Sequence, residues 1–167
     1  MTPLQPFETE LVALLPRMRR FAHGLSRNPA EADDLTQATV ERALRSRAQW
    51  QPGTRLDSWL YRIMRNLWID TARAKSRRLR HEAPEEEAAA VGDDPRDGIE
   101  ASAELSRAMG AMQRLPDEQR EVVALILVEG FGYREAAELL DLPIGTVSSR
   151  LVRGRTALLA MLGRCDA

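Results

Sequence analysis

The sequence predicts an all-α protein made of two small helical domains that are joined by an acidic, flexible linker. Leu, Ala, Arg and Glu dominate the composition, and these residues favour helices. Apolar residues recur at intervals of three and four, whereas no segment alternates with a period of two for long enough to predict a strand. Charge is also segregated along the chain. We therefore expect domains at residues 1–81 and 105–167, with the linker at residues 82–104.

The overall net charge of −1 conceals this segregation. Residues 1–81 carry 15 Lys and Arg against 8 Asp and Glu, and residues 105–167 carry 8 of each kind. Residues 82–104 carry nine acids and one Arg, together with Pro and Gly, so self-repulsion should keep this segment extended. The first domain is therefore suited to approach a polyanion such as a nucleic acid.

Several classes of protein are excluded by composition. One Cys and two His cannot form a disulfide framework or an ordinary structural zinc site. The chain has no Gly-rich phosphate loop and no Ser-His-Asp arrangement beyond chance, so we expect no cofactor, no metal and no enzymatic activity. No apolar stretch approaches the ~20 residues of a membrane span, and the N-terminus lacks the pattern of a secretory signal. A cytoplasmic protein with no membrane insertion follows.

Helices are expected throughout the first domain. An apolar face runs through residues 7–26, where Pro16 suggests a kink or a late start. Asn28 and Pro29 should cap a second helix that ends near residue 47. The apolar residues expected to be buried in that helix are Ala32, Leu35, Val40, Ala43 and Leu44. Its polar face carries Asp33, Asp34, Gln37, Glu41 and Arg45.

A third helix is expected after a turn at residues 51–54. Its apolar stripe contains Leu56, Leu60, Ile63 and Leu67. The side chains expected away from that stripe are Tyr61, Arg65, Trp68, Arg73, Lys75, Arg77, Arg78 and Arg80. Trp59 is expected in the core.

The second domain contains the strongest local signal. After helices near residues 100–113 and from Asp117 to about 130, two short helices flank a turn at residues 142–145, and the second helix begins at Thr146. The small Ala137 and the apolar Val147 would let them cross closely as a helix-turn-helix, which places the second helix in a major groove. A plain helical hairpin is the alternative. Two residues depart from the usual pattern: Asp141 occupies a position where glycine is common, and Gly154 should cost the helix about 1 kcal/mol relative to alanine.

Four segments together resemble the extracytoplasmic-function (ECF, group IV) sigma factors of the sigma-70 family. They read DDLTQATVERAL at residues 33–44, QPGTRLDSWLYRIMRN at 51–66, LPDEQRE at 115–121 and GTVSSRL at 145–151. The resemblance implies a sigma region 2 helical bundle in the first domain and a sigma region 4 helix-turn-helix in the second. The segment DLPIGT at 141–146 and the charge map point to the general-stress subgroup of alphaproteobacteria.

The resemblance also implies partners. The family docks on the RNA polymerase core, through the β′ clamp coiled coil and the β subunit, and region 2 contacts the promoter −10 element. The positions that match the polymerase-binding helix are Asp34, Leu35, Gln37 and Glu41, with Leu35 expected as an exposed anchor. The positions that match the −10 contacts are Gln51, Pro52, Gly53, Thr54, Tyr61, Arg65, Asn66, Arg73, Lys75, Arg77 and Arg78. Tyr61 and Trp68 would either stack on bases or fill the core.

Region 4 of the family contacts the −35 element. Ser148, Ser149, Val152 and Arg153 are expected to face bases, whereas Thr146, Arg150 and Arg155 face the DNA backbone. Anti-sigma factors commonly inhibit such proteins, so an anti-sigma partner is also implied. The chain would then direct promoter-specific transcription initiation as a polymerase subunit. The alternative is a helix-turn-helix regulator that acts without the polymerase.

Overall fold

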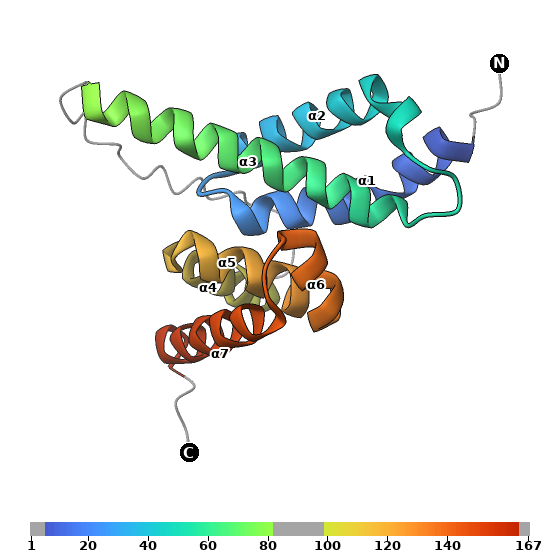
Figure 1. The fold of residues 1–167 in the computed structure, drawn as a ribbon. Helices are drawn as coiled ribbons and strands as arrows, with labels where there is room; N and C mark the ends of the chain where they lie inside the picture. Colours follow the sequence, from blue (N-terminus) through green and yellow to red (C-terminus); the bar gives the residue numbers. More distant parts are fainter. Residues whose placement is uncertain (1–5, 82–98, 164–167) are drawn as a thin grey trace. The chain divides into compact units, whose positions relative to one another are not determined.

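The computed structural model describes residues 6–81 and 99–163, and every regular element in these two ranges is a helix or a helical turn (Figure 1). The described residues group into two compact units. The first contains residues 6–22 and 28–81, and the second contains residues 23–27 and 99–163. The all-α fold class predicted from the sequence is confirmed.

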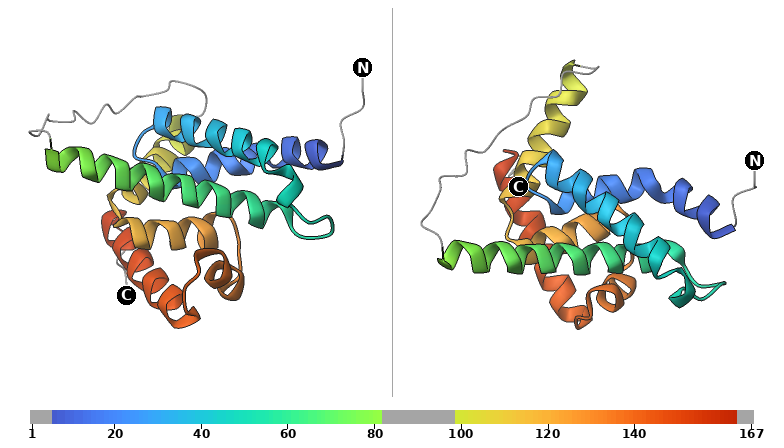
Figure 2. Two further views of the ribbon diagram at one scale, coloured as in Figure 1. Left: turned by 45° about the horizontal axis from the view of Figure 1, so that its top comes forward. Right: turned by 90° about the horizontal axis from the view of Figure 1, so that it is seen from above.

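Three helices and a short 3-10 turn build the first unit. They are α1 (Pro6–Leu25), of which residues 6–22 belong to this unit, α2 (Pro29–Arg45), the 3-10 turn η1 (Arg47–Gln49) and α3 (Leu56–His81). Helices α2 and α3 pack side by side, as both views of Figure 2 show. The side chains at the centre are fully buried, and they include Met18, Phe21, Leu56, Leu60 and Met64. The α1 helix continues through Pro16.

The start of α2 confirms the cap predicted from Asn28 and Pro29. The Oδ1 atom of Asn28 accepts a hydrogen bond of 2.8 Å from the backbone N–H of Glu31, and Pro29 stands at the first helical position. This side-chain acceptor satisfies one of the free N–H groups at the helix start.

The buried face of α2 is rotated from the expected one. Ala32, Leu35 and Ala43 are buried as predicted, but Val40 is half-buried and Leu44 is 47% exposed. Thr36 and Thr39 take their places, because each hydroxyl donates to the carbonyl four residues earlier, at 2.8 and 2.7 Å. A threonine that satisfies its own hydroxyl within the helix packs in a core without an orphaned donor.

The buried face of α3 also departs from the predicted stripe. Leu56 and Leu60 are buried, whereas Ile63 and Leu67 are half-buried. Tyr61, expected on the outer side, is 1% exposed, and its ring meets Phe21 edge-on with centroids 4.8 Å apart. This edge-to-face contact makes Tyr61 a core residue.

Asp57, in the first turn of α3, is enclosed by donors. Its carboxylate accepts hydrogen bonds from Arg55 at 3.1 and 2.9 Å and from the Ser58 N–H at 2.7 Å, and Arg17 lies 3.4 Å away. Burial by itself raises the pKa of Asp57, but the hydrogen bonds from Arg55 and Ser58 and the charges of both arginines outweigh it. The pKa of Asp57 therefore lies below its ordinary value of 3.8.

This lowered pKa predicts how acid affects the first unit. A carboxyl whose pKa is lower in the folded than in the unfolded state stabilises the fold above pH 3.8, and the contribution is lost as the pH falls through the folded pKa. We expect Asp57→Asn to lower the unfolding free energy by about 1 kcal/mol at pH 7. The difference from the unaltered chain should shrink below pH 3.8. All three tryptophans lie at residues 50–68, so urea unfolding followed by tryptophan fluorescence monitors this unit. A difference that stays constant from pH 7 to pH 2 would contradict the prediction.

The second unit contains four helices. They are α4 (Ile99–Arg114), α5 (Asp117–Val123), α6 (Tyr133–Leu140) and α7 (Ile144–Met161), with a π turn η2 (Ala124–Val128) that extends α5. Helix α7 packs against α4, α5 and α6. The α4 helix includes residues 99–104, which were expected to belong to the linker. The rest of the expected linker, residues 82–98, lies outside the described residues.

The apolar segment that runs from α5 into η2 is partly core and partly surface. Val122, Val123, Ala124 and Leu125 are buried, whereas Leu127 is 52% exposed. In the π turn, the N–H of Glu129 donates to the Ala124 carbonyl at 3.0 Å, which inserts one extra residue into the turn.

Within residues 6–81 and 99–163, no helix is long and apolar enough to cross a membrane. In the same ranges, no three or more His, Cys, Asp or Glu side chains are placed to hold a metal ion.

Candidate nucleic-acid interface

Helices α6 and α7 form the predicted helix-turn-helix. Ala137 and Val147, which were expected at the crossing, are buried. The α7 helix begins at Ile144, two residues earlier than expected, because Pro143 is in the extended conformation that precedes a helix. The Thr146 N–H donates to the Pro143 carbonyl at 3.0 Å.

The turn between the two helices is a Schellman motif. The N–H of Leu142 donates to the Ala137 carbonyl at 2.9 Å, and the N–H of Asp141 donates to the Glu138 carbonyl at 3.3 Å. Asp141 itself is left-handed, with φ 54° and ψ 49°, and no other non-glycine residue in the described ranges has a positive φ. Glycine adopts this left-handed conformation without strain, and aspartate is among the other side chains that tolerate it best.

Asp141→Gly is expected to stabilise the second unit by about 0.5–1 kcal/mol, because it removes the Cβ that disfavours a left-handed backbone. Asp141→Ala is the matched control, since it keeps the Cβ and should bring no gain. Hydrogen–deuterium exchange of peptides from α6 and α7 measures the local opening free energy. Equal protection in the two variants would contradict the backbone explanation.

Helix α7 presents a continuous exposed face opposite its buried side. Ser149, Val152, Arg153 and Arg155 are exposed, and Thr146 and Ser148 are half-buried. The Ser149 Oγ donates to the Thr146 carbonyl at 3.1 Å, and the Arg153 Nε donates to the Ser149 carbonyl at 3.3 Å. These local contacts leave the η nitrogens of Arg153 on the outer face of the helix, where a guanidinium is suited to contact guanine.

Arg150 does not lie on this exposed face, although it was expected to face the DNA backbone. Its side chain is only 17% exposed. It forms ion pairs with Glu118 at 3.4 Å and Glu121 at 3.8 Å, both on α5. The structure therefore does not bring Arg150 to the exposed face that carries Arg153 and Arg155.

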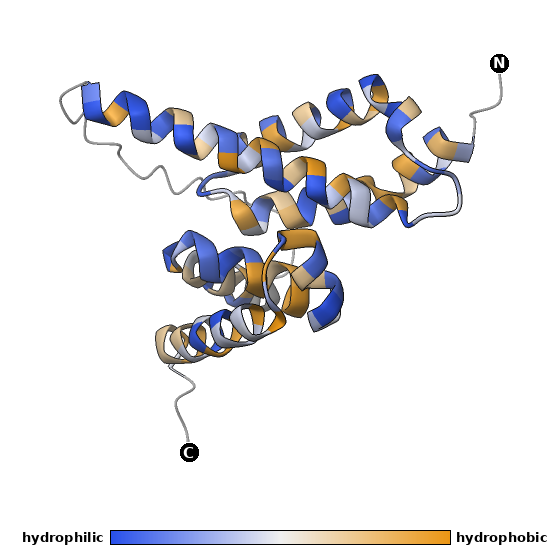
Figure 3. Cartoon of the chain, viewed as in Figure 1, coloured by the Kyte–Doolittle hydropathy of each residue, from blue (hydrophilic) through white to orange (hydrophobic). Residues whose placement is uncertain are grey.

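The C-terminal half of α3 carries a basic face. Arg73, Arg77 and Arg80 are exposed and, with Asp70 and Ser76, line a shallow open hollow. Arg78 is also exposed, and Figure 3 shows that this half of the helix is mostly hydrophilic. Three guanidinium groups along one side of a helix are suited to successive phosphates of a nucleic acid.

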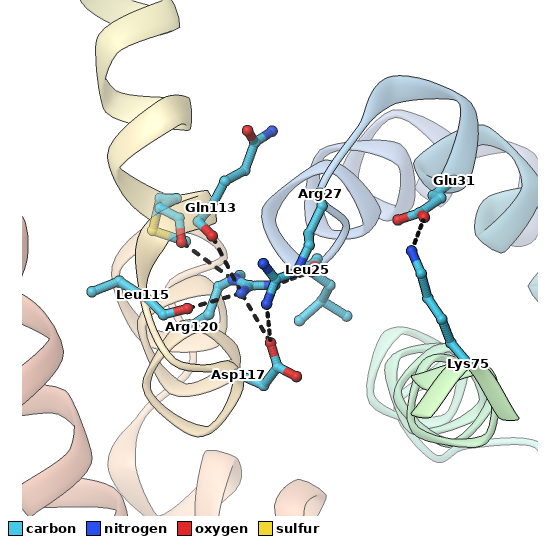
Figure 4. A network of polar contacts seen from close by, with 9 residues as sticks. Leu25, Arg27, Glu31, Lys75, Gln113, Leu115, Asp117 and Arg120 are labelled. Atoms are coloured by element: carbon cyan, nitrogen blue, oxygen red, sulfur yellow. Dashed lines mark hydrogen bonds and ion pairs between the residues drawn. The ribbon is translucent and has the colours of Figure 1, made fainter. Parts of the chain in front are cut away.

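Lys75 does not belong to this face. It is half-buried, and its Nζ atom lies 3.2 Å from the Glu31 carboxylate at the start of α2 (Figure 4). The pair connects α3 to α2 within the first unit, so the structure does not place Lys75 beside the arginines.

The remaining −10 candidates divide into exposed and buried groups. Gln51, Pro52, Gly53 and Thr54 form an exposed turn, in which the Thr54 hydroxyl donates to the Gln51 carbonyl at 2.6 Å and Gly53 takes φ +90°. Asn66 is exposed, and Arg65 and Trp68 are half-buried. Tyr61 is buried against Phe21, so its ring is not available to stack on a base.

Helix α2 presents a polar ridge, formed by Asp34, Gln37 and Glu41. All three are exposed, and the Gln37 amide donates to the Glu41 carboxylate at 3.3 Å. Helical spacing placed Leu35 in the core, whereas the family resemblance implied an exposed anchor; Leu35 is 8% exposed and belongs to the core. Helical spacing was therefore right for Leu35, and the exposed anchor implied by the resemblance was wrong.

One residue that organises the second unit was not singled out from the sequence. Arg120 is 1% exposed and donates to the backbone carbonyls of Leu25, Met112, Gln113 and Leu115 at 2.7–3.4 Å, as the close view in Figure 4 shows. Its guanidinium also pairs with Asp117 at 2.9 Å, while Arg27 lies 3.8 Å from the same carboxylate. Burial lowers the pKa of Arg120 and Asp117 opposes the shift, with a lowered value as the result. The spacing of Asp117 and Arg120 at i, i+3 is the only sequence signal of this network.

A helix-turn-helix with an exposed arginine on its second helix, together with a separate basic helix, is typical of a DNA-binding protein. Family comparison supports this class. Residues 11–78 match the family model of sigma-70 region 2, and residues 105–158 match that of sigma-70 region 4.

Individual relatives of the chain are sigma factors as well. The chain is 38% identical to the ECF RNA polymerase sigma factor EcfG of Rhodopseudomonas palustris, over 92% of this chain and 83% of that protein. It is also 38% identical to the sigma factor SigE of Mycolicibacterium smegmatis, over 85% of this chain and 56% of that protein. A solved structure of the sigma factor RpoE in complex with the anti-sigma factor NepR, from Bartonella quintana, is 30% identical with a TM-score of 0.85, and the match covers 98% of this chain and 100% of that one.

The chain belongs to the sigma-70 family and is similar to its ECF RNA polymerase sigma factors. These relatives are sigma factors, which direct transcription initiation at promoters and are not enzymes.

Proposed function

We propose that the two units of this sigma factor divide promoter recognition between them. The first unit contacts the RNA polymerase core through α2 and the −10 element through α3 and the turn at residues 51–54. The second unit contacts the −35 element through α7. The observation that carries this proposal is the exposed face of α7, where Ser149, Val152 and Arg153 stand together on the second helix of a helix-turn-helix.

The polar ridge of α2 fits a basic helical partner. Asp34 and Glu41 offer carboxylates and Gln37 offers an amide, all exposed on one side of the helix. Such a ridge complements a basic coiled coil, which is the expected docking element of the β′ subunit. Because Leu35 is buried, recognition here rests on polar contacts.

The basic face of α3 supports contact with the −10 DNA. Arg73, Arg77 and Arg80 would contact phosphates, and Arg78 lies next to them. The exposed turn at residues 51–54 and the exposed Asn66 remain candidates for contacts with bases, because an amide side chain offers a donor and an acceptor to a base edge. Lys75 and Tyr61 are assigned to packing, as their contacts indicate.

An anti-sigma factor is the second partner that we propose. The Bartonella quintana relative was solved in complex with an anti-sigma factor. The similarity to ECF RNA polymerase sigma factors supports a cytoplasmic site of action, where the polymerase works, and the general-stress subgroup expected from the sequence is part of the same proposal.

Run-off transcription from a pooled promoter library, with the full chain and purified core polymerase, tests the function. We expect transcripts only when both proteins are present, and the enriched promoters should share two separated elements. Specific duplex binding by the chain alone, with no transcription in the presence of the core, would favour the stand-alone regulator.

Arg153→Ala is expected to relax sequence preference at the −35 element. Loss of a bidentate contact to guanine costs about 1–3 kcal/mol of discrimination, so the preference between a matched and a mismatched −35 element should fall at least fivefold. Binding of the polymerase–sigma complex to the two promoters is the measurement. Arg155→Ala is the matched control, since loss of a phosphate contact weakens both promoters equally. An equal loss on both promoters with Arg153→Ala would contradict the assignment.

A further inference from the structure

Arg150 stands in the middle of the helix that we propose to contact DNA, yet its contacts lie within the protein. The Nη2 atom lies 3.4 Å from the Glu118 carboxylate, and the Nη1 atom lies 3.8 Å from the Glu121 carboxylate. Glu121 is 5% exposed and Glu118 is 72% exposed. The guanidinium therefore joins a buried acid and a surface acid of α5.

The position of Arg150 around the helix explains these contacts. At about 100° per residue, Arg150 lies roughly 60° from Val147, whereas Arg153 lies roughly 120° from Val147 on the same side. Val147, Leu151 and Gly154 form the buried stripe that packs on the rest of the unit. Arg150 thus flanks the buried stripe next to α5, and Arg153 points outward.

A contact with DNA phosphate would compete with these ion pairs. Moving the guanidinium outward would take its positive charge away from Glu121. The loss of an ionic partner by a buried carboxylate is destabilising. Keeping the guanidinium in place instead fixes how far α7 is rotated and how deeply it sits on α5. Contacts to base edges need side chains held to about 0.5 Å, so this rotation controls where Ser149 and Arg153 meet the DNA.

We propose that Arg150 is a positioning residue, which orients the DNA-contacting face of α7 through Glu118 and Glu121 and does not contact phosphate. The inference rests on the proposed role of α7 at the −35 element. When Glu118 or Glu121 is neutralised, a positioning role and a phosphate contact predict changes of opposite sign in the affinity for DNA. Removing an acid beside a phosphate-binding arginine would strengthen DNA binding, whereas removing the partner of a positioning arginine weakens it.

The test measures binding of promoter DNA by the full chain assembled with core polymerase, over a series of salt concentrations. Glu121→Gln and Arg150→Gln are each expected to weaken binding about fivefold, and the double variant should be no weaker than either single one, as expected for residues that act as a unit. The slope of log K against log salt should stay at its unaltered value in all three. Arg155→Ala should reduce that slope by about 0.9, which is the signature of one lost phosphate contact.

Two further variants keep the test decisive. Glu118→Gln changes a side chain that is 72% exposed, and it should weaken binding about twofold, a smaller loss than for the buried Glu121. Glu104→Gln, at an exposed position on α4, corrects for the loss of one negative charge. Tighter binding by Glu118→Gln or Glu121→Gln, after this correction, would overturn the proposal. A drop in the salt slope with Arg150→Gln equal to that of Arg155→Ala would also overturn it.

Failure of the proposed function can be told apart from failure of the positioning role, because the unaltered chain would then also fail to bind promoter DNA. If the unaltered chain and core polymerase bind no promoter, both proposals are overturned. If they bind and only the variants of the Arg150 cluster behave as phosphate contacts, the positioning role alone is overturned.

Discussion

Gly154→Ala is expected to destabilise the second unit by about 1–3 kcal/mol, although alanine is the better helix former by about 1 kcal/mol. A Cβ at this position would lie 2.7 Å from the Cγ2 atom of Val123, with the Gln119 Cβ and backbone carbonyl at 3.4 and 3.5 Å behind it. Valine is stiff at χ1, so its methyl group cannot simply turn away. The helix backbones of α5 and α7 would have to separate to admit one methyl group.

Gly110→Ala is the matched control for this prediction. Gly110 also lies within a helix, but nothing stands within 4 Å of the Cβ that alanine would add. This variant should gain up to about 1 kcal/mol from helix propensity alone. Hydrogen–deuterium exchange of peptides from α5 and α7 gives the opening free energies, and for a unit of this size 1 kcal/mol corresponds to about 4–8 °C in Tm. Stabilisation by both alanines would show that α5 and α7 do not pack as closely as described.

Replacing Arg120 with methionine is expected to destabilise the second unit by about 3 kcal/mol or more. Methionine fills a comparable volume but leaves the carbonyls of Met112, Gln113 and Leu115 without their donor. Each buried acceptor that loses its partner costs about 1–3 kcal/mol, and hydrogen bonds from a charged donor stand at the upper end. Asp117, about half exposed, can recover water and adds little to the loss.

Arg120→Lys separates charge from geometry. An ammonium keeps the positive charge beside Asp117, but it has one nitrogen, whereas the guanidinium uses three to contact carbonyls in different directions. We expect lysine to recover less than half of the loss. Arg114→Met, at an exposed position at the end of α4, should change the unfolding free energy by no more than about 0.5 kcal/mol. Comparable exchange protection in Arg114→Met and Arg120→Met would contradict the role given to Arg120.

Local signals in the sequence predicted much of the fold correctly. The Asn28–Pro29 cap, the turn before α7 and the burial of Ala137 and Val147 all depend on residues close in the chain. Capping, turn formation and helical spacing are local, so a few neighbouring residues carry the necessary information. The exposed residues of α7 and of the α2 ridge follow from the same spacing.

The errors occurred at the borders between helix faces. Leu44 was expected in the core and is exposed, whereas Tyr61 and Thr39 are buried. Hydrophobicity predicts that Leu44 is more buried than Tyr61 or Thr39, but the reverse is found. Tyr61 gains an edge contact with Phe21, and the Thr39 hydroxyl donates to the Leu35 carbonyl. The first contact depends on a neighbour in the folded structure and the second on a side-chain rotamer. The spacing of apolar residues along the sequence carries no information about either.

The helical class, the charge segregation and the family of the chain were all predictable before folding is considered, because they depend on composition and on short motifs. The contacts of Gly154, Arg120 and Arg150, in contrast, could be found only in the folded chain. Each of them acts on a partner from another helix or from a distant carbonyl: Gly154 on Val123, Arg120 on Met112 and Leu115, and Arg150 on Glu121. Close approach, buried polar contacts and ion pairs between helices arise only when the chain is folded, so the same arginine can contact DNA or hold a helix in place according to the face on which packing leaves it.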